Sequence, residues 1–347
     1  MHSRFIIRVA ATLSAMVLQV TPVRSGDPKE NVSSKESPPR QQARTTVERS
    51  LAFLEKDAVA WRRQHRCATC HHGALTVWAL SEAKKQHYTV AEETLAEMRN
   101  WTKAGFVPAA DQRPNRRPGD NVPDLAAVYL TLSTWAEPVG VTHDEIGRIA
   151  KHISDRQESD GAWPLPPPRI AAPPVFESRE TMTIWFYLAL ERDVPGDPKQ
   201  PSSARESRTK AAKWLNETKP GDTTQTAALR LLIDVRKGKS AKPLQAGIDR
   251  LLSRQKADGG WGQSKDLPSD AYATGQALYV LSLAGVKDDR PEIRRAVGFL
   301  VANQNEDGSW PMTPRATSER AASRTSVPIV YFGSAWATLG LIRSLPQ

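Results

Sequence analysis

Near its C-terminus the chain reads Gln304-Asn-Glu-Asp-Gly-Ser-Trp310, and two earlier segments follow the same pattern. These are Gln157-Glu-Ser-Asp-Gly-Ala-Trp163 and Gln255-Lys-Ala-Asp-Gly-Gly-Trp261. The three tryptophans are 98 and 49 positions apart, which is two periods and one period. A fixed period of this size is typical of a repeat architecture. Six such periods span nearly all of residues 44–345.

The period also predicts degenerate copies of the pattern. One is expected near position 212, where Ala211-Ala-Lys-Trp-Leu215 is followed by Pro220-Gly-Asp222. Two more are expected near positions 114 and 65. The repeat therefore accounts for the whole chain beyond its first 43 residues.

Each repeat is predicted to be a helical hairpin around an Asp-Gly turn. Before the turn, apolar residues recur on one helical face, as at Ile248, Leu251 and Leu252 or at Val297, Leu300 and Val301. After the turn, the segments Ala271–Ala284, Thr181–Leu190 and Gly333–Ile342 are apolar nearly all round, which is typical of buried helices. We expect Asp222 and Asp270 to be N-caps of two buried helices. The predicted fold class is all-α, with six buried inner helices and six amphipathic outer helices.

The last repeat resembles a known motif. Arg295-Ala-Val-Gly-Phe-Leu300, Gln304 and Gly308-Ser-Trp310 are similar to the QW motif of squalene–hopene and oxidosqualene cyclases, and Gln245–Trp261 and Ile149–Trp163 are looser copies. The resemblance, to the terpenoid cyclase and protein prenyltransferase superfamily, covers about residues 44–345. It implies an (α/α)6 toroid of six helical hairpins, in which the Gln and Trp side chains tie the outer helices together.

The catalytic motifs of this superfamily have no counterpart in the sequence. Class II cyclases protonate an alkene with an Asp-x-Asp-Asp motif, because this step needs a strong acid built from clustered carboxyls. The nearest segments, Gly221-Asp-Thr-Thr-Gln-Thr226 and Pro268-Ser-Asp-Ala-Tyr272, carry one carboxylate each at the matching place. Prenyltransferases hold zinc with an Asp, a Cys and a His, and neither cysteine here lies late enough to match. Catalytic residues therefore remain unassigned.

A different chemistry is indicated by Cys67-Ala-Thr-Cys70-His71, the c-type haem attachment pattern. The two thiols would attach one haem covalently, and His71 would be the proximal ligand of its iron. The period of 49 places this motif at the start of the first inner helix, at one mouth of the toroid. Leu75 and Trp78 follow it and are expected to belong to the core.

Several alternatives to haem remain open. The two cysteines could form a disulfide, or Cys67, Cys70 and a histidine, His71 or His72, could bind zinc with one further ligand. A thioredoxin-like redox pair is disfavoured because no βαβ pattern surrounds the motif.

The sixth haem ligand is unknown from the sequence. Met312 and Met182 are candidates because both lie near the same mouth, and methionine would raise the reduction potential. The remaining histidines considered are His65, His87, His143 and His152.

Arginines recur in the connections between outer and inner helices, and could ring the mouth to bind haem propionates or an anionic substrate. They are Arg113, Arg116, Arg117, Arg179, Arg315, Arg320 and Arg324. The segment Pro164–Pro174 is expected to be a stiff connector.

The N-terminus predicts export. Arg4 and Arg8 precede an apolar stretch, Val9 to Val20, which is followed by the expected cleavage region Val23-Arg24-Ser25. This is the pattern of a secretory signal, here residues 1–25. Residues 26–43 are rich in Ser, Pro, Lys, Glu and Gln and are expected to form a disordered linker, with structure beginning near Arg44. The expected location is periplasmic or extracellular.

Composition excludes some classes of function. The chain has 347 residues, 48 Lys+Arg against 38 Asp+Glu, 39% hydrophobic residues and a net charge of +10. The basic residues are not gathered into runs, which disfavours nucleic-acid binding, and no apolar stretch is long enough for a membrane helix. Two functions are favoured: an exported haem c protein for redox or electron transfer at the cavity mouth, or a cyclase-related enzyme or isoprenoid binder. A non-catalytic scaffold or binding module is a third, weaker alternative.

Overall fold

In the computed structural model, Ser37–Gln347 form one compact unit. The structure describes residues 38–65, 69–107, 125–137, 140–166, 173–191, 202–315 and 319–345. The predicted signal segment, residues 1–25, lies outside these ranges. The first helix begins at Pro38, so the predicted start of structure near Arg44 is too late.

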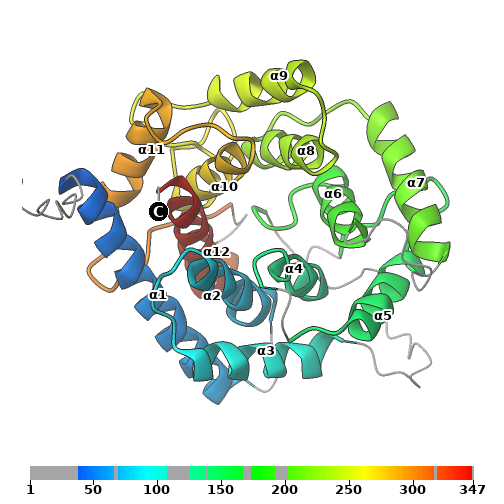
Figure 1. Ribbon diagram of the computed structural model, residues 1–347, viewed down its shortest axis with the longest axis horizontal. Helices are drawn as coiled ribbons and strands as arrows, with labels where there is room; N and C mark the ends of the chain where they lie inside the picture. The colour runs from blue at the N-terminus through cyan, green and yellow to red at the C-terminus, as the bar shows by residue number, and fades with distance from the viewer. Residues whose placement is uncertain are drawn as a thin grey trace, which may run out of the picture. The chain divides into compact units, whose positions relative to one another are not determined.

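The described residues form two concentric rings of helices (Figure 1). The outer ring contains α1 (Pro38–Gln64), α3 (Glu92–Phe106), α5 (His143–Ser154), α7 (Ser202–Glu217), α9 (Ala241–Leu252) and α11 (Pro291–Ala302). The inner ring contains α2 (Thr76–Lys85), α4 (Leu125–Ser133), α6 (Arg179–Leu190), α8 (Thr224–Arg236), α10 (Ala271–Leu283) and α12 (Glu319–Ser344). The π-helical turn η1 (Cys70–Leu75) leads into α2. Outer and inner helices alternate along the chain, which confirms the predicted all-α toroid of six hairpins.

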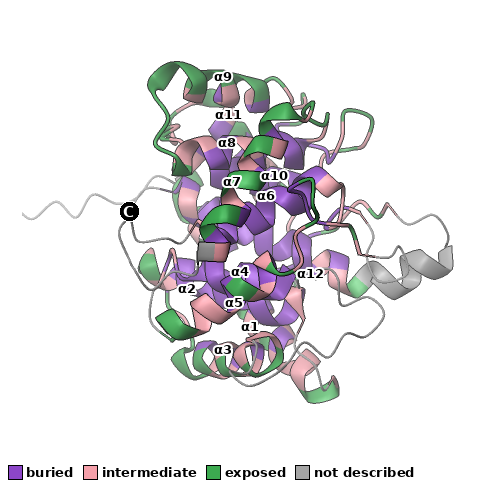
Figure 2. Cartoon of the chain, turned by 90° about the vertical axis from the view of Figure 1, so that its right-hand side faces the viewer, coloured by how far each residue is buried: buried purple, intermediate pink, exposed green. Residues whose placement is uncertain are grey.

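Burial follows the two rings, because the inner helices are apolar nearly all round and the outer ones on one face. Every residue from Ala271 to Leu281 of α10 is buried, whereas α9 buries only Ile248 and Leu251. Figure 2 shows buried residues concentrated in the inner helices and exposed ones on the outer helices.

The Gln of each repeat joins its turn to the next outer helix. Nε2 of Gln157 donates to the carbonyl oxygen of Ser207 at 2.8 Å, and Nε2 of Gln255 to that of Glu292 at 2.7 Å. Nε2 of Gln304 donates to the carbonyl oxygen of Thr46 in α1 at 2.9 Å. The last hairpin is thereby bonded to the first, and the outer ring closes.

The Trp of each repeat anchors the same turn inside its own hairpin. The indole Nε1 of Trp310 donates to the carbonyl oxygen of Leu300 in α11 at 2.7 Å, and its backbone N–H donates to Ser334 Oγ in α12 at 3.0 Å. Trp163 and Trp261 make the matching pair of bonds. The Gln and Trp of the repeat are therefore structural residues.

Two details of the predicted repeat are wrong. Trp214 lies within α7 and under the guanidinium of Arg179, so it does not occupy the turn of the fourth hairpin. Thr223, not Asp222, caps α8, because the Thr223 side chain accepts from Thr226 N. Asp270 does cap α10, accepting from Ala273 N at 2.9 Å.

Among the described residues, no helix is both long enough and apolar enough to cross a bilayer.

Candidate functional site

The inner ring is filled at its centre by five aromatic side chains, here called the aromatic plug. Trp78, Tyr129, Trp185, Tyr279 and Trp336 come from α2, α4, α6, α10 and α12, and each is at most 2% exposed. Their ring centroids lie 5.3–6.4 Å apart in pairs, mostly edge to face, the geometry that aromatic quadrupoles favour. Because the plug joins opposite sides of the ring, the toroid has no open axial channel at this level.

Four donors of the plug have no hydrogen-bond partner among the described residues. They are the Tyr129 hydroxyl and the indole Nε1 atoms of Trp78, Trp185 and Trp336. A buried donor left unpaired costs about 1–3 kcal/mol. Such groups need an explanation, and a bound ligand or water with an acceptor oxygen is one.

The Cys-His motif lies where the period predicted, at the start of the first inner helix. Cys70 is the first residue of η1, and Thr69 caps this turn by accepting from His72 N at 3.1 Å. Cys70 is half-buried. Burial raises the pKa of Tyr129 and Tyr272 well above the usual value, and Cys70 contributes to both shifts. The turn that begins at Cys70 packs directly against α4. Cys67 lies outside the described residues.

His71 and His72 are buried with an aromatic neighbour on each side. His72 is fully buried, between Trp61 of α1 at 4.4 Å and Tyr331 of α12 at 3.8 Å between ring centroids. His71 is 8% exposed and meets Trp61 and Phe332 edge to face. This packing fixes both imidazole rings.

The two imidazoles are hydrogen-bonded in series to Asp57. His72 Nε2 lies 2.8 Å from Asp57 Oδ2, and His72 Nδ1 bonds His71 Nδ1. Burial lowers the pKa of His71 to about 2, and the neighbouring His72 and His65 add to this. Burial also lowers the pKa of His72, although Asp57 opposes the shift. Both rings are therefore neutral at physiological pH.

The predicted sixth ligands lie in different places. Met312 packs against Gly333, next to Phe332 and hence at the same end of the ring as His71. Met182 is fully buried in the first turn of α6. Neither is shown in contact with His71.

The other histidines are spread more widely. His65 stacks on Trp61 with centroids 3.6 Å apart, so it belongs to the His71 cluster. His87 follows the C-terminal end of α2, opposite to the end that carries the motif, and His143 and His152 lie on outer helix α5. Among the described residues, no three His, Cys, Asp or Glu side chains are grouped to hold a metal ion.

The described arginines of the predicted ring are already paired. Arg179 bonds Asp160 at 2.7 Å, and Arg315 bonds Glu177 at 2.5 Å. Arg113, Arg116 and Arg117, and the side chains of Arg320 and Arg324, lie outside the described part. The pairings of Arg179 and Arg315 do not favour the prediction that these two bind an external anion.

A buried polar network, missed by the sequence analysis, crosses this mouth of the toroid. Glu177 accepts from Arg315 and, at 2.6 Å, from Thr223 Oγ1, while Gln225 and the Tyr272 hydroxyl lie 2.9 Å apart. Burial raises the pKa of Glu177, and its bonds to Thr223 and Arg315 oppose this. The network links the hairpins of α6, α8, α10 and α12.

Neither Asp222 nor Asp270 is part of a carboxyl cluster of the kind that protonates an alkene in class II cyclases. Asp222 is exposed and paired with Arg254, which lowers its pKa. Burial raises the pKa of Asp270 to about 6, but this carboxylate is used as a helix cap and accepts from Gln263 Nε2 at 2.6 Å. The sequence-based assignment of Asp270 as a cap is confirmed.

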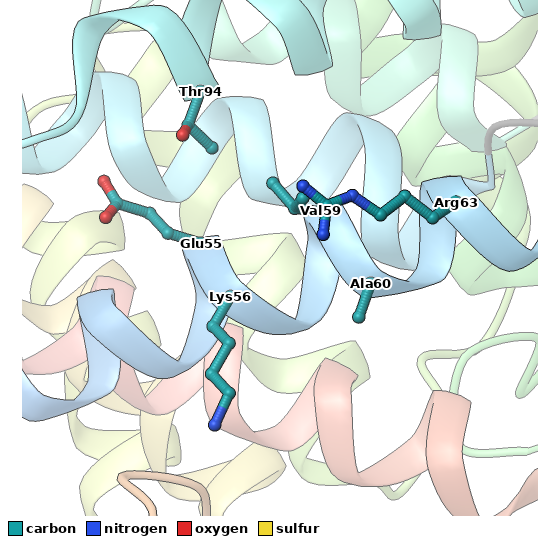
Figure 3. Close-up of a pocket in the computed structure, with 6 residues that line it drawn as sticks. All are labelled: Glu55, Lys56, Val59, Ala60, Arg63 and Thr94. Atoms are coloured by element: carbon teal, nitrogen blue, oxygen red, sulfur yellow. The ribbon is translucent and has the colours of Figure 1, made fainter.

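A separate pocket of about 380 Å³ lies outside the ring of inner helices, between α1 and α3 (Figure 3). It is lined by Glu55, Lys56, Val59, Ala60, Arg63 and Thr94. Glu55 accepts there from the backbone N–H of Ala91 at 2.8 Å, just before α3. None of these lining residues belongs to the Cys-His motif.

Solved structures share this architecture. Two structures of the type II terpene cyclase MstE from Scytonema, in complex with geranylgeranyl dihydroxybenzoate, superpose with TM-scores of 0.55 and 0.53. Each match covers 89% of this chain and 99% of the other, at 15% identity. The chain therefore has the α/α toroid fold of these structures.

Sequence comparisons agree with this toroid. The squalene-hopene cyclase N-terminal domain family matches residues 202–304. A squalene–hopene cyclase of Bradyrhizobium diazoefficiens is 30% identical over 248 residues, which is 67% of this chain and 33% of that protein. A drimenyl diphosphate synthase of Streptomyces showdoensis is 31% identical over 107 residues, 30% of this chain and 18% of that protein. The toroid thus spans a third or less of the length of the curated relatives it matches.

Proposed function

We propose that this toroid binds an isoprenoid or similar apolar chain that carries an oxygen acceptor. The observation that carries the proposal is the set of four unpartnered donors within the aromatic plug, the Tyr129 hydroxyl and the indole Nε1 atoms of Trp78, Trp185 and Trp336. Aromatic faces contribute a large apolar contact area, and the donors would bond a hydroxyl, carbonyl or ester oxygen. The solved relative holding a geranylgeranyl compound supports this ligand class.

The ligand would lie on the side of the plug where the inner helices begin. Trp185 and Trp336 close the axis itself, and the Tyr129 hydroxyl shares its surroundings with Cys70 and Tyr272. With Asp270 used as a cap and Asp222 exposed, the chain lacks an acid cluster for alkene protonation among its described residues. We therefore propose binding, not cyclisation, as the role of this interior.

Tryptophan fluorescence tests the binding proposal. Titration with geranylgeraniol should change the emission saturably, and squalene, which has no oxygen, should bind more weakly. Tyr129→Phe keeps the ring and removes the hydroxyl, so affinity for the alcohol should fall about 10-fold, as for one lost hydrogen bond. Affinity for squalene should not change.

Tyr187→Phe is the matched control, because the Tyr187 ring faces Arg208 of outer helix α7. Absence of saturable binding, or cyclised products formed from squalene, would contradict the proposal.

A second candidate function is covalent haem c binding after export. It is supported by the Cys67–His71 motif and by the ring atom Nε2 of His71. Nε2 of His71 has no hydrogen-bond partner among the described residues, while Nδ1 is bonded to His72. This donor set fits a haem: Cys67 and Cys70 would hold it by thioether bonds, and His71 Nε2 would bind the iron. The haem would supply one-electron chemistry. A disulfide or a zinc ion at Cys67 and Cys70 is the alternative use of this motif.

The haem candidate is tested by the visible spectrum of the full chain, exported from a host with cytochrome c maturation. An α-band that survives denaturation, and that is lost in Cys67→Ala or His71→Ala, would support covalent haem. A colourless protein would rule it out, and bound zinc and the cysteine redox state would then be measured.

A further inference from the structure

The hydrogen bonds from Asp57 through His72 to His71 define which nitrogen carries each proton. A carboxylate only accepts hydrogen bonds, so Nε2 of His72 must carry its proton toward Asp57 Oδ2, 2.8 Å away. A neutral imidazole has one N–H, so His72 Nδ1 is an acceptor. Its partner, His71 Nδ1, is therefore the donor.

The same reasoning leaves one nitrogen of His71 with a lone pair. If Nδ1 of neutral His71 carries the proton, Nε2 has none and can bind a metal ion or take up a proton. Ligating histidines are commonly set in this way, by a bond from the other ring nitrogen to an outer partner. Asp57 and Trp61, four residues apart on α1, reach His72 from one helical face.

We propose that Asp57 and His72 are positioning residues that fix His71 as the Nδ1–H tautomer and present its Nε2 as a ligating nitrogen. His72 acts as a neutral relay between the carboxylate and His71. It is held between Trp61 and Tyr331, and its backbone carbonyl accepts from Thr76 Oγ1 at 3.0 Å. The inference rests on His71 being the ligand in the second candidate function.

The relay is tested in the haem-free full chain by ¹⁵N NMR of the histidine rings, which separates protonated from unprotonated ring nitrogens. His71→Gln assigns the His71 signals. The expected spectrum has His71 protonated at Nδ1 and His72 at Nε2. A His71 ring protonated at Nε2 would overturn the proposal.

Asp57→Ala removes the carboxylate that accepts from His72 Nε2. The Nε2–H tautomer of His71 should then appear as a second population, because neither ring any longer has a fixed donor. His72→Phe, which keeps the stacking on Trp61 and removes both nitrogens, should have the same effect. Unchanged tautomers in folded Asp57→Ala or His72→Phe protein would overturn the proposal.

Glu48→Ala, an exposed acid on the same helix, is the control and should leave both tautomers unchanged. The outcome is separable from the haem test. A colourless chain with His71 in the Nδ1–H form would contradict the haem function and support the relay. A protein that binds haem, but whose haem-free chain has His71 in the Nε2–H form, would support the haem function and contradict the relay.

Discussion

Trp185 and Trp336 meet across the axis of the toroid, with ring centroids 6.0 Å apart. Their helices, α6 and α12, occupy opposite places in the inner ring (Figure 1). The contact closes the centre of the inner ring at this level. The indole N–H groups of both residues have no hydrogen-bond partner among the described residues.

Closure of the outer ring depends on Gln304. Gln304→Ala removes its bonds to the carbonyl oxygens of Thr46 and Gly308, at 2.9 and 3.0 Å. We expect a loss of about 1–3 kcal/mol in the free energy of unfolding, since buried acceptors lose their partner. Urea unfolding measures it, and Gln245→Ala, at an exposed position, should change stability by less than about 0.5 kcal/mol. Equal effects of the two substitutions would contradict this role.

Helices α10 and α12 approach closely at Gly275. A Cβ at this position would lie 2.3 Å from the carbonyl oxygen of Trp336, which is backbone and cannot easily yield. Gly275→Ala should therefore destabilise the chain by about 1–3 kcal/mol or more, as overpacking does. Gly298→Ala in α11, where a Cβ meets nothing within 4 Å, should stabilise it by about 0.5–1 kcal/mol. Thermal unfolding of both variants checks the contrast, and a stable Gly275→Ala protein would refute it.

The buried cap Asp270 makes stability depend on pH. Burial raises its pKa to about 6, above the unfolded value of about 3.9, so the folded state binds the proton more tightly. The stabilisation is present below pH 4 and is lost as pH rises through 6, by about 2–3 kcal/mol. Asp270→Asn still caps α10 and should remove this part of the pH dependence.

Urea unfolding between pH 4 and 8 measures this difference. The control Asp222→Asn should leave the pH profile in this range nearly unchanged, because Arg254 lowers the pKa of Asp222 and its carboxylate takes up a proton only at lower pH. Identical pH profiles for wild type and Asp270→Asn would show that the pKa of Asp270 is not raised in the folded protein.

The ion pair of Arg315 and Glu177 joins the segment after Trp310 to the start of α6. Arg315→Gln leaves the Glu177 carboxylate, only 5% exposed, without its cation. We expect a loss of about 1–3 kcal/mol at pH 8, and a smaller loss as the pH falls, because burial raises the pKa of Glu177 and a protonated carboxyl needs no cation. Arg40→Gln, whose pair with Asp288 is exposed, should cost less than about 1 kcal/mol. A loss that does not depend on pH would contradict the assignment.

The hairpins were predictable because Gln and Trp recur, with the same spacing, at the turns of three repeats. The fourth turn was misplaced because α7 continues to Glu217, and Trp214 serves as a platform for Arg179 instead. The aromatic plug and the Asp57–His72 bond could not be predicted from the sequence. Both features bring together side chains from different helices, and which side chains meet depends on how the helices pack once the ring has closed. The i,i+4 spacing of Asp57 and Trp61 indicates in the sequence only that these two side chains share one face of a helix.

The most direct measurement of the central claim is the intact mass of the full chain after incubation with geranylgeraniol, first under native and then under denaturing conditions. Binding in the toroid predicts one geranylgeraniol per chain in the native spectrum, released on denaturation and weakened in Tyr129→Phe. A native spectrum without bound geranylgeraniol would contradict the claim. A mass addition of one haem that survives denaturation would establish the second candidate function independently.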